Sequence, residues 1–158
     1  ILHTARKYVC ITTPYLILDD EMEIALKLAA QSGVDVTIIT PKIEDKWYVH
    51  PVTRSYYAGL IREGVRIFEY TPGFIHAKLF VSDDTVATVG SVNMDYRSFY
   101  FHFECGAWMC GTRAVSQVKR HFDEILSQSE EITLASLEAE PLHKKFRRWL
   151  LRIFAPFM

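Results

Sequence analysis

Three short runs of apolar, largely β-branched residues alternate with two amphipathic patterns in the first half of this 158-residue chain. Each run has the length of a strand, and each amphipathic stretch repeats its apolar residues at helical spacing. Asp20 can cap the first helix, and Gly33 can stop it. The predicted order is strand 7–12, helix 20–32, strand 34–40, helix 51–64 and strand 65–70. Such alternation predicts an α/β fold, a mixed and mostly parallel sheet flanked by helices on both faces.

The second half predicts antiparallel additions to that sheet and then a helical end. The order is strand 75–81, turn 82–85, strand 85–89, strand 100–109 and helix 112–128. Apolar residues make up 49% of the chain, which is enough for one sizeable core. We therefore expect one folded unit over residues 1–128 and a helical extension over residues 129–158.

One spaced motif concentrates reactive side chains in the predicted hairpin. The motif reads His76-x-Lys78, four residues, Asp83, six residues, Gly90-Ser91-x-Asn93. His76 can act as an acid, a base or a nucleophile, and Lys78 supplies a cation. Because side chains two apart on a strand share a face, His76 and Lys78 should project together. Ser91 and Asn93 should lie near them, beyond the second strand, which gives a set suited to attack on a phosphodiester.

The motif resembles the HKD signature of the phospholipase D superfamily at every specified position. Residues 75–104 are further similar to the second HKD repeat of bacterial cardiolipin synthases, as are Thr13-Pro14-Tyr15 and the segment 56–65. The resemblance covers about residues 1–125 and implies that 1–128 is a phospholipase D-like catalytic repeat. It also implies two motifs facing each other across a pseudo-twofold axis. One histidine then forms a phosphohistidine while the other protonates the leaving alkoxide.

The resemblance assigns roles within the motif. Lys78 and Asn93, assisted by Ser91, would bind the non-bridging phosphate oxygens, where charge grows in the transition state. His76 would be the general acid. Asp83, in the turn, would organise the site and perform no chemistry.

The resemblance extends to residues after the motif. Glu104 would hold the imidazole of His76 in the right tautomer, and the alternative is that it pairs with Arg97 or faces solvent. Arg97 could bind a lipid phosphate or only support its loop. His102, two residues before Glu104, would be a neighbour of the pocket and not a second catalyst.

This implied chemistry needs two motifs, and the chain contains one complete HKD motif. One explanation is that the chain is the C-terminal half of a two-repeat enzyme and works with the N-terminal repeat of the same parent. The other is a single-motif protein that forms homodimers. The first is favoured because the resemblance is to a two-repeat subfamily.

The resemblance implies transfer of a phosphatidyl group from one phosphatidylglycerol to another, with release of glycerol. The alternatives are hydrolysis, by a phospholipase D or a nuclease, and an inactive lipid-binding or dimerisation half. We expect no metal and no other cofactor.

Basic residues gather at the C-terminal end. The net charge is −1, yet residues 141–158 hold five Lys/Arg and no acid, which leaves −6 for the rest. In a helix ended by Pro156, one side would carry apolar residues and the opposite side basic ones. The apolar set is Leu142, Phe146, Trp149, Leu150, Ile153 and Phe157, and the basic set is Lys144, Lys145, Arg148 and Arg152. We expect residues 142–157 to contact an anionic membrane surface; the alternative is packing on protein.

The same charge distribution favours lipid over nucleic acid as the substrate. A nuclease would be expected to carry a basic surface around the motif, whereas the body of this chain is mildly acidic. No apolar run is long enough to cross a bilayer. We expect the parent at the cytoplasmic face of the cell membrane, anchored by N-terminal transmembrane helices outside this chain.

Overall fold

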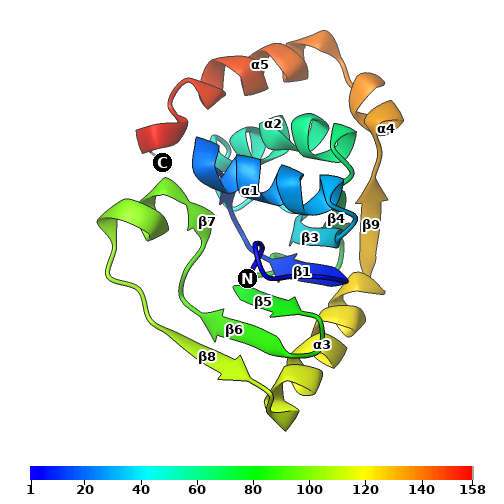
Figure 1. The fold of residues 1–158 in the computed structure, drawn as a ribbon. Helices are drawn as coiled ribbons and strands as arrows, with labels where there is room; N and C mark the ends of the chain where they lie inside the picture. Colours follow the sequence, from blue (N-terminus) through cyan, green and yellow to red (C-terminus); the bar gives the residue numbers. More distant parts are fainter. Residues whose placement is uncertain (158) are drawn as a thin grey trace.

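A seven-stranded mixed sheet forms the centre of the computed structural model, which describes residues 1–157 (Figure 1). The strand order is β8 (Gly106–Cys110), β6 (Val86–Gly90), β5 (Leu79–Ser82), β1 (Tyr8–Thr12), β3 (Asp35–Pro41), β4 (Arg66–Tyr70) and β9 (Ser129–Ile132). The pairs β1–β3 and β3–β4 are parallel, and every other pair in this sheet is antiparallel. The mixed sheet flanked by helices is therefore confirmed, with parallel pairing confined to its middle.

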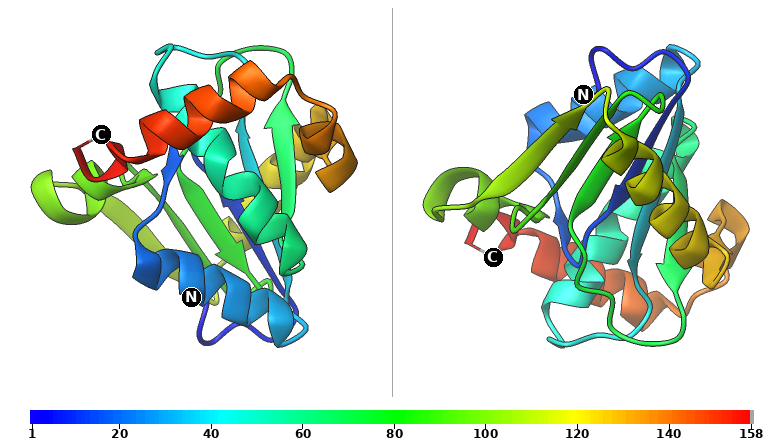
Figure 2. Two further views of the ribbon diagram at one scale, coloured as in Figure 1. Left: turned by 90° about the horizontal axis from the view of Figure 1, so that it is seen from above. Right: turned by 90° about the horizontal axis from the view of Figure 1, so that it is seen from below.

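Helices cover both faces of this sheet (Figures 1 and 2). Helices α1 (Asp20–Gln31) and α2 (Val49–Arg62) lie on one face, and α3 (Arg113–Leu126) lies on the other. The chain ends with α4 (Leu134–Glu138), α5 (Leu142–Arg152) and the short η2 (Ala155–Phe157), and α5 packs along α2. None of the helices within residues 1–157 is long and apolar enough to span a bilayer.

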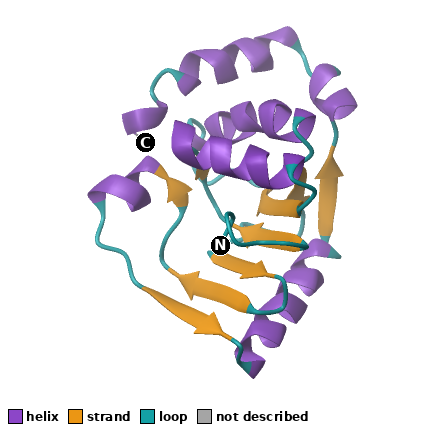
Figure 3. Ribbon diagram, viewed as in Figure 1, coloured by secondary structure: helices purple, strands orange, loops and turns teal. Residues whose placement is uncertain are grey.

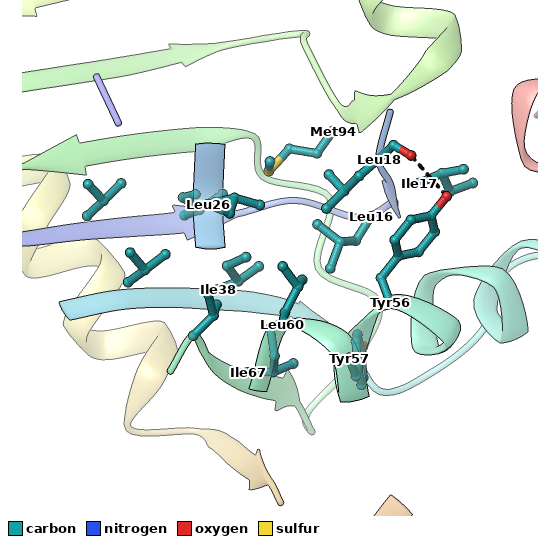
Figure 4. Packing of buried hydrophobic residues seen from close by; sticks show 14 of the residues in the cluster. Leu16, Ile17, Leu18, Leu26, Ile38, Tyr56, Tyr57, Leu60, Ile67 and Met94 are labelled. Carbon is teal, nitrogen blue, oxygen red and sulfur yellow. Dashed lines mark hydrogen bonds between the residues drawn. The ribbon is translucent and has the colours of Figure 1, made fainter. Parts of the chain in front are cut away.

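Alternation along the strands divides the apolar residues into two cores. Val9 and Ile11 of β1 face α1 and α2, whereas Cys10 between them faces α3. The first core also holds Tyr56, whose hydroxyl donates a hydrogen bond of 3.0 Å to the Leu18 carbonyl (Figure 4). Each strand therefore needs helices on both sides, which explains the three-layer arrangement.

The ends of α1 lie within one residue of their predicted positions. The N-cap is Asp19, one residue before the predicted Asp20, and its carboxylate accepts from the Met22 N–H at 2.8 Å. The helix ends at Gln31, and Gly33 follows with a φ of +87°, a conformation that glycine adopts without strain.

The predicted strand 75–81 is wrong in its first half, because β5 begins only at Leu79. Leu79 pairs with Thr12, the last residue of β1. The chain after Thr12 runs into Pro14, which has no N–H to donate to a neighbouring strand. His76 and Lys78 consequently lie just beyond the paired part of the sheet.

The predicted strand 100–109 is also wrong in its first half. Residues Arg97–Phe101 form η1, a π-helical turn, and β8 begins only at Gly106 (Figure 3). The Asp95 carboxylate accepts from the Ser98 N–H at 2.7 Å, and this local side-chain bond draws the backbone out of the extended state. Asp95 itself belongs to β7 (Met94–Asp95), which pairs with β2 (Leu16–Ile17) in a separate two-stranded sheet.

Strand β9 was missed by the sequence analysis, which placed residues 129–158 in a helical extension. Ser129–Ile132 instead forms an edge strand against β4. Its exposed acids pair with nearby cations: Glu130 with Lys42, which follows β3, and Glu131 with Arg66 of β4 at 3.0 Å. The predicted end of the last helix at Pro156 is wrong as well, because α5 ends at Arg152.

Asp83 ties the β5–β6 turn to the start of β1. Its carboxylate accepts from the N–H groups of Arg6, Lys7 and Tyr8 at 2.6, 3.0 and 2.9 Å. Partial burial acts to raise the pKa of this carboxyl, but the three backbone donors outweigh burial and lower it. Asp83 also has a φ of +52° in the turn, a conformation that Asp tolerates better than most residues.

Replacing Asp83 with Asn keeps the shape and removes the charge. We expect Asp83→Asn to lower the free energy of unfolding at pH 7 by about 1 kcal/mol, because neutral acceptors form weaker hydrogen bonds and solvent screens this site. A lowered folded-state pKa stabilises the fold above the ordinary carboxyl pKa of 3.8, and this stabilisation is lost as the pH falls through the lowered value. Urea unfolding from pH 7 to pH 3 should therefore show the difference shrinking, whereas Glu138→Gln should change little at either pH.

Gly90 lets β6 approach β8 more closely than any other residue would allow. A Cβ atom at this position would lie 2.4 Å from the Cys105 carbonyl oxygen and 2.6 Å from the Gly106 Cα. Both contacts are to backbone, which cannot swing away. The glycine of the motif therefore has a packing role in this sheet.

We expect Gly90→Ala to cost about 1–3 kcal/mol of unfolding free energy, because the backbone of β8 must shift to admit the methyl group. Gly73→Ala is the matched control, since a Cβ atom there meets nothing within 4 Å. Thermal or urea unfolding of the two variants compares them directly. Equal stability of both would contradict the close approach.

Candidate active site

Most of the motif residues lie near the end of the parallel strands β1 and β3. Thr13 follows β1, and its N–H donates to the Ile39 carbonyl of β3 at 3.1 Å. The Thr13 hydroxyl oxygen accepts from the N–H of Met94, one residue after Asn93, at 3.1 Å. Open α/β sheets commonly bind ligands at the carboxyl ends of their parallel strands.

His76 and Lys78 lie side by side at this edge. The Lys78 Nζ atom is 2.9 Å from Nδ1 and 3.1 Å from Nε2 of His76, and it donates to the His76 carbonyl at 2.8 Å. Both residues line an open cavity of about 580 Å³, together with Gly90, Ser91 and residues of α3. The imidazole and the ammonium group can therefore reach the same bound group from solvent.

The pKa values of both groups are lowered from their ordinary values. Partial burial lowers the pKa of His76, and the positive charge of Lys78 lowers it further. Burial also lowers the pKa of Lys78, while the carboxylates of Glu104 and Asp95 act in the opposite direction. The unliganded site thus favours a neutral imidazole beside a cation.

Aromatic rings enclose His76, and the sequence analysis gave them no role. The Tyr15 ring lies edge-on to the imidazole at 6.4 Å, and the Phe74 ring lies at 5.8 Å. The Tyr15 hydroxyl donates to Asp45 at 2.5 Å, and the Lys46 ammonium lies 5.5 Å from the Tyr15 ring. Tyr15 could have been found as the aromatic residue that follows the Thr13-Pro14 strand end, and Phe74 as the residue two before His76.

Glu104 reaches the site through Ser91. The Ser91 hydroxyl donates to the Glu104 carboxylate and accepts from the Cys105 N–H at 3.0 Å. The hydrogen bond from Ser91 is the main cause that lowers the pKa of Glu104. The Nδ1 atom of His102 lies 3.8 Å from the same carboxylate. Within residues 1–157 no hydrogen bond joins Glu104 to His76, so the expected orienting contact is not formed in this chain.

Asn93 is held by its backbone. Its N–H donates to the Ser98 hydroxyl at 3.1 Å, while its side-chain Oδ1 is buried with no hydrogen-bond partner in the part of the chain that the structure describes. An unpaired buried acceptor costs about 1–3 kcal/mol, and such groups in native proteins often mark functional sites.

Two of the predicted site residues lie outside this group of contacts. Asp83 binds the backbone at the start of β1, at the opposite end of β5 from Lys78. Arg97, in η1, is exposed, and its guanidinium forms no hydrogen bond or ion pair with any other described residue. The described residues also contain no cluster of His, Cys, Asp and Glu side chains able to hold a metal ion.

Comparison with known proteins gives the family. Residues 1–126 match the sequence profile described as "Cardiolipin synthase, PLD-like domain". An uncharacterized protein of Streptococcus mutans is 47% identical over the whole chain, and cardiolipin synthase 2 of Bacillus anthracis is 36% identical over the whole chain. The chain spans about a third of these relatives, 34% of the first and 31% of the second.

Solved structures share the fold at low sequence identity. The phospholipase D family member Nuc from Salmonella typhimurium superposes with a TM-score of 0.72 at 15% identity, over 83% of this chain and 85% of that one. Phosphatidylserine synthase from Haemophilus influenzae gives a TM-score of 0.73 at 17% identity, over 99% of this chain and 41% of that one. With its matching sequence profile and its relatives of more than 30% identity, the chain belongs to the cardiolipin synthase family of phospholipase D-like domains.

Proposed function

We propose that this chain is the C-terminal catalytic half of a cardiolipin synthase. The reaction moves a phosphatidyl group from one phosphatidylglycerol to the hydroxyl of another and releases glycerol. The observation that carries the proposal is the contact between the Lys78 ammonium and the His76 imidazole at the wall of an open cavity. The similarity of the whole of this chain to parts of cardiolipin synthases supports the proposed substrate class.

The proposed mechanism has two displacement steps at phosphorus. In the first, a histidine attacks, the bond from phosphorus to the glycerol oxygen breaks, and a second histidine gives that oxygen a proton. In the second step, the hydroxyl of another phosphatidylglycerol loses its proton to the second histidine and displaces the first. Lys78 and Asn93 would stabilise the non-bridging oxygens, and Ser91 would support them. Arg97, exposed in η1, would contact a lipid phosphate.

We assign His76 the acid–base role. Its lowered pKa leaves it neutral in the unliganded chain, whereas an acid must carry a proton. A bound phosphodiester anion beside the ring would raise this pKa again, since a negative charge favours the imidazolium form. Substrate binding would therefore prepare the ring for protonating the leaving group.

The complete site needs a second HKD motif, and the other His-x-Lys spacing of this sequence, His143-x-Lys145, lacks the Asp and the Gly-Ser-x-Asn that complete it. The relatives are about three times as long as the chain, which favours the N-terminal repeat of the same parent as the source. A second copy of this chain is the alternative. Once the halves join, Glu104 would orient an imidazole, and its present hydrogen bond to Ser91 keeps it ionised and close to Lys78.

Hydrolysis by a phospholipase D or nuclease is the second candidate function, and the fold alone is compatible with it. Lipid transfer is favoured because of the relatives and because the basic segment lies at the C-terminal end of the chain and not around the motif. The proposed location of the parent is the cytoplasmic face of the cell membrane.

The central test replaces His76 in the full-length parent. We expect His76→Ala to lower cardiolipin formation from phosphatidylglycerol by about 100- to 10,000-fold, the usual contribution of a general acid–base group, with folding retained. His3→Ala is the control, because His3 is an exposed histidine outside the motif. Mass spectrometry of the lipid products measures the rate. Retained turnover in His76→Ala would show that His76 takes no part in the reaction. Formation of phosphatidic acid in place of cardiolipin by the unaltered parent would show that the enzyme is a hydrolase and not a synthase.

The pairing of His76 with Lys78 can be tested by titration. We expect NMR of this chain to give His76 a pKa below the ordinary 6.5, and Lys78→Met to raise it because one of the two main causes of the shift is removed. Lys144→Met removes a cation from another surface and should leave the value unchanged. An unaltered His76 pKa in Lys78→Met would show that the ammonium does not sit beside the ring in solution.

A further inference from the structure

Helix α5 is amphipathic, and it presents its apolar side to solvent. Leu142, Phe146 and Trp149 are 81%, 62% and 63% exposed, and Ile153 and Phe157 are also exposed. None of the residues of α5 itself is buried. A surface helix normally turns this side toward the core, so the orientation requires an explanation.

Basic residues of α5 turn toward the rest of the protein and hold the helix in place. Arg148 pairs with Glu140, which also pairs with Arg54 of α2 at 2.7 Å. Arg152 pairs with Glu23 of α1 at 3.1 Å, and its guanidinium lies 4.1 Å from the ring centre of Tyr56. These ion pairs span three helices, and they fix α5 with most of its apolar row exposed.

A cationic cleft runs along one flank of the same helix. It has a volume of about 310 Å³ and is lined by Lys42, Glu44, His50, Pro51, Arg54, Glu69, Glu140, Lys144, Arg147 and Arg148. Five of these residues are Lys or Arg and three are Glu. Lys144 and Arg147 of α5 form no ion pair or side-chain hydrogen bond with any other residue in 1–157. This flank therefore carries uncompensated positive charge beside the apolar row.

Exposed aromatic residues also occur in the segment that follows the motif. Figures 1 and 2 show the C-terminal end of the chain beside η1. Tyr100 and Phe101 of η1, and Phe103 after it, are exposed, as is Phe157 of η2. Exposed aromatic residues therefore occur both at the C-terminal end and in the segment that follows the motif.

We propose that α5 docks this domain onto an anionic lipid surface. Its aromatic row enters the headgroup–acyl boundary, and Arg147, three residues before Leu150, contacts a lipid phosphate at the border of the row. Lys144 lies farther round the helix and adds to the positive charge of this flank. A protein partner would explain the apolar row alone, but the cations on this flank match the negative surface of a bilayer. The ion pairs to Glu140 and Glu23 hold the row outward before any lipid is present, so docking needs no rearrangement of the helix.

Flotation of the 158-residue chain with vesicles tests this proposal. We expect binding to phosphatidylglycerol/phosphatidylcholine vesicles and much weaker binding to pure phosphatidylcholine. The double variant Phe146→Ser/Trp149→Ser should lose at least about tenfold in vesicle affinity, because two aromatic contacts with lipid are removed. Its matched control is Ile24→Ser/Leu28→Ser, which removes two apolar residues of α1 that are 54% and 52% exposed.

The charge contribution has its own pair of variants. Lys144→Gln/Arg147→Gln should lose about 25-fold on anionic vesicles, since each cation near such a surface contributes about fivefold, and little on neutral ones. Arg113→Gln/Arg120→Gln, on exposed positions of α3, is the matched control. In a Trp47→Phe/Trp108→Phe background, the fluorescence of Trp149 should shift to the blue on binding.

Two results would overturn the proposal: no binding of the wild-type chain to anionic vesicles, or equal losses in the variants of α5 and their controls. Sedimentation tests the alternative that a second copy of this chain covers the apolar row of α5. If the wild-type chain dimerises without lipid and Phe146→Ser/Trp149→Ser is monomeric, the row is a contact between copies. Because docking uses no catalytic residue, His76→Ala should bind vesicles like the wild type, so failure of docking and failure of the proposed reaction are distinguishable.

Discussion

The antiparallel pairing of β5 with β1 determines where the reactive side chains lie. Its last register pair joins Leu79 to Thr12, so the chain before Leu79 leaves the sheet beside the end of β1. At the other end of β5, the Asp83 carboxylate clamps the turn to the N–H groups at the start of β1. The hairpin is therefore fixed at both ends against a buried central strand. His76 and Lys78 project from a rigid edge, which is the condition for placing groups accurately around a phosphate.

The residues of the motif divide between those that hold this hairpin and those with a proposed role toward the substrate. At Gly90 the backbone of β8 lies closer than any side chain would permit. The Asp83 carboxylate accepts hydrogen bonds from three backbone N–H groups and so serves the fold. His76 and Lys78 remain free to react. Ser91 belongs to both groups, because it joins the backbone of Cys105 to the carboxylate of Glu104. The spacing of the motif thus reflects the geometry of a hairpin as much as the chemistry at its end.

Much of the fold could be predicted because its signals are local. The helix caps, the β-branched runs and the turn at Ser82–Thr85 all act within a few residues, and the structure has them within one or two positions. The errors arose where tertiary contacts decide. The aromatic residues 99–101 favour an extended backbone by propensity, yet the hydrogen bond from the Ser98 N–H to the Asp95 carboxylate favours the helical turn of η1. The polar β9 has no apolar alternation to signal a strand, and it forms because β4 offers it a free edge and because Arg66 of β4 and Lys42 after β3 pair with its acids.

The sequence alone determined the α/β order, the hairpin and the pairing of His76 with Lys78, since spacing along the chain controls each of them. It also showed that α5 would carry apolar and basic sides. Only the tertiary structure decided which side faces the protein, because that choice depends on Glu140 and Glu23 lying where the cations of α5 can reach them. It likewise decided that Tyr15 and Phe74 flank the imidazole and that Glu104 binds Ser91. Contacts between residues distant in sequence depend on how the strands pair, and the spacing of residues within one segment does not predict that pairing.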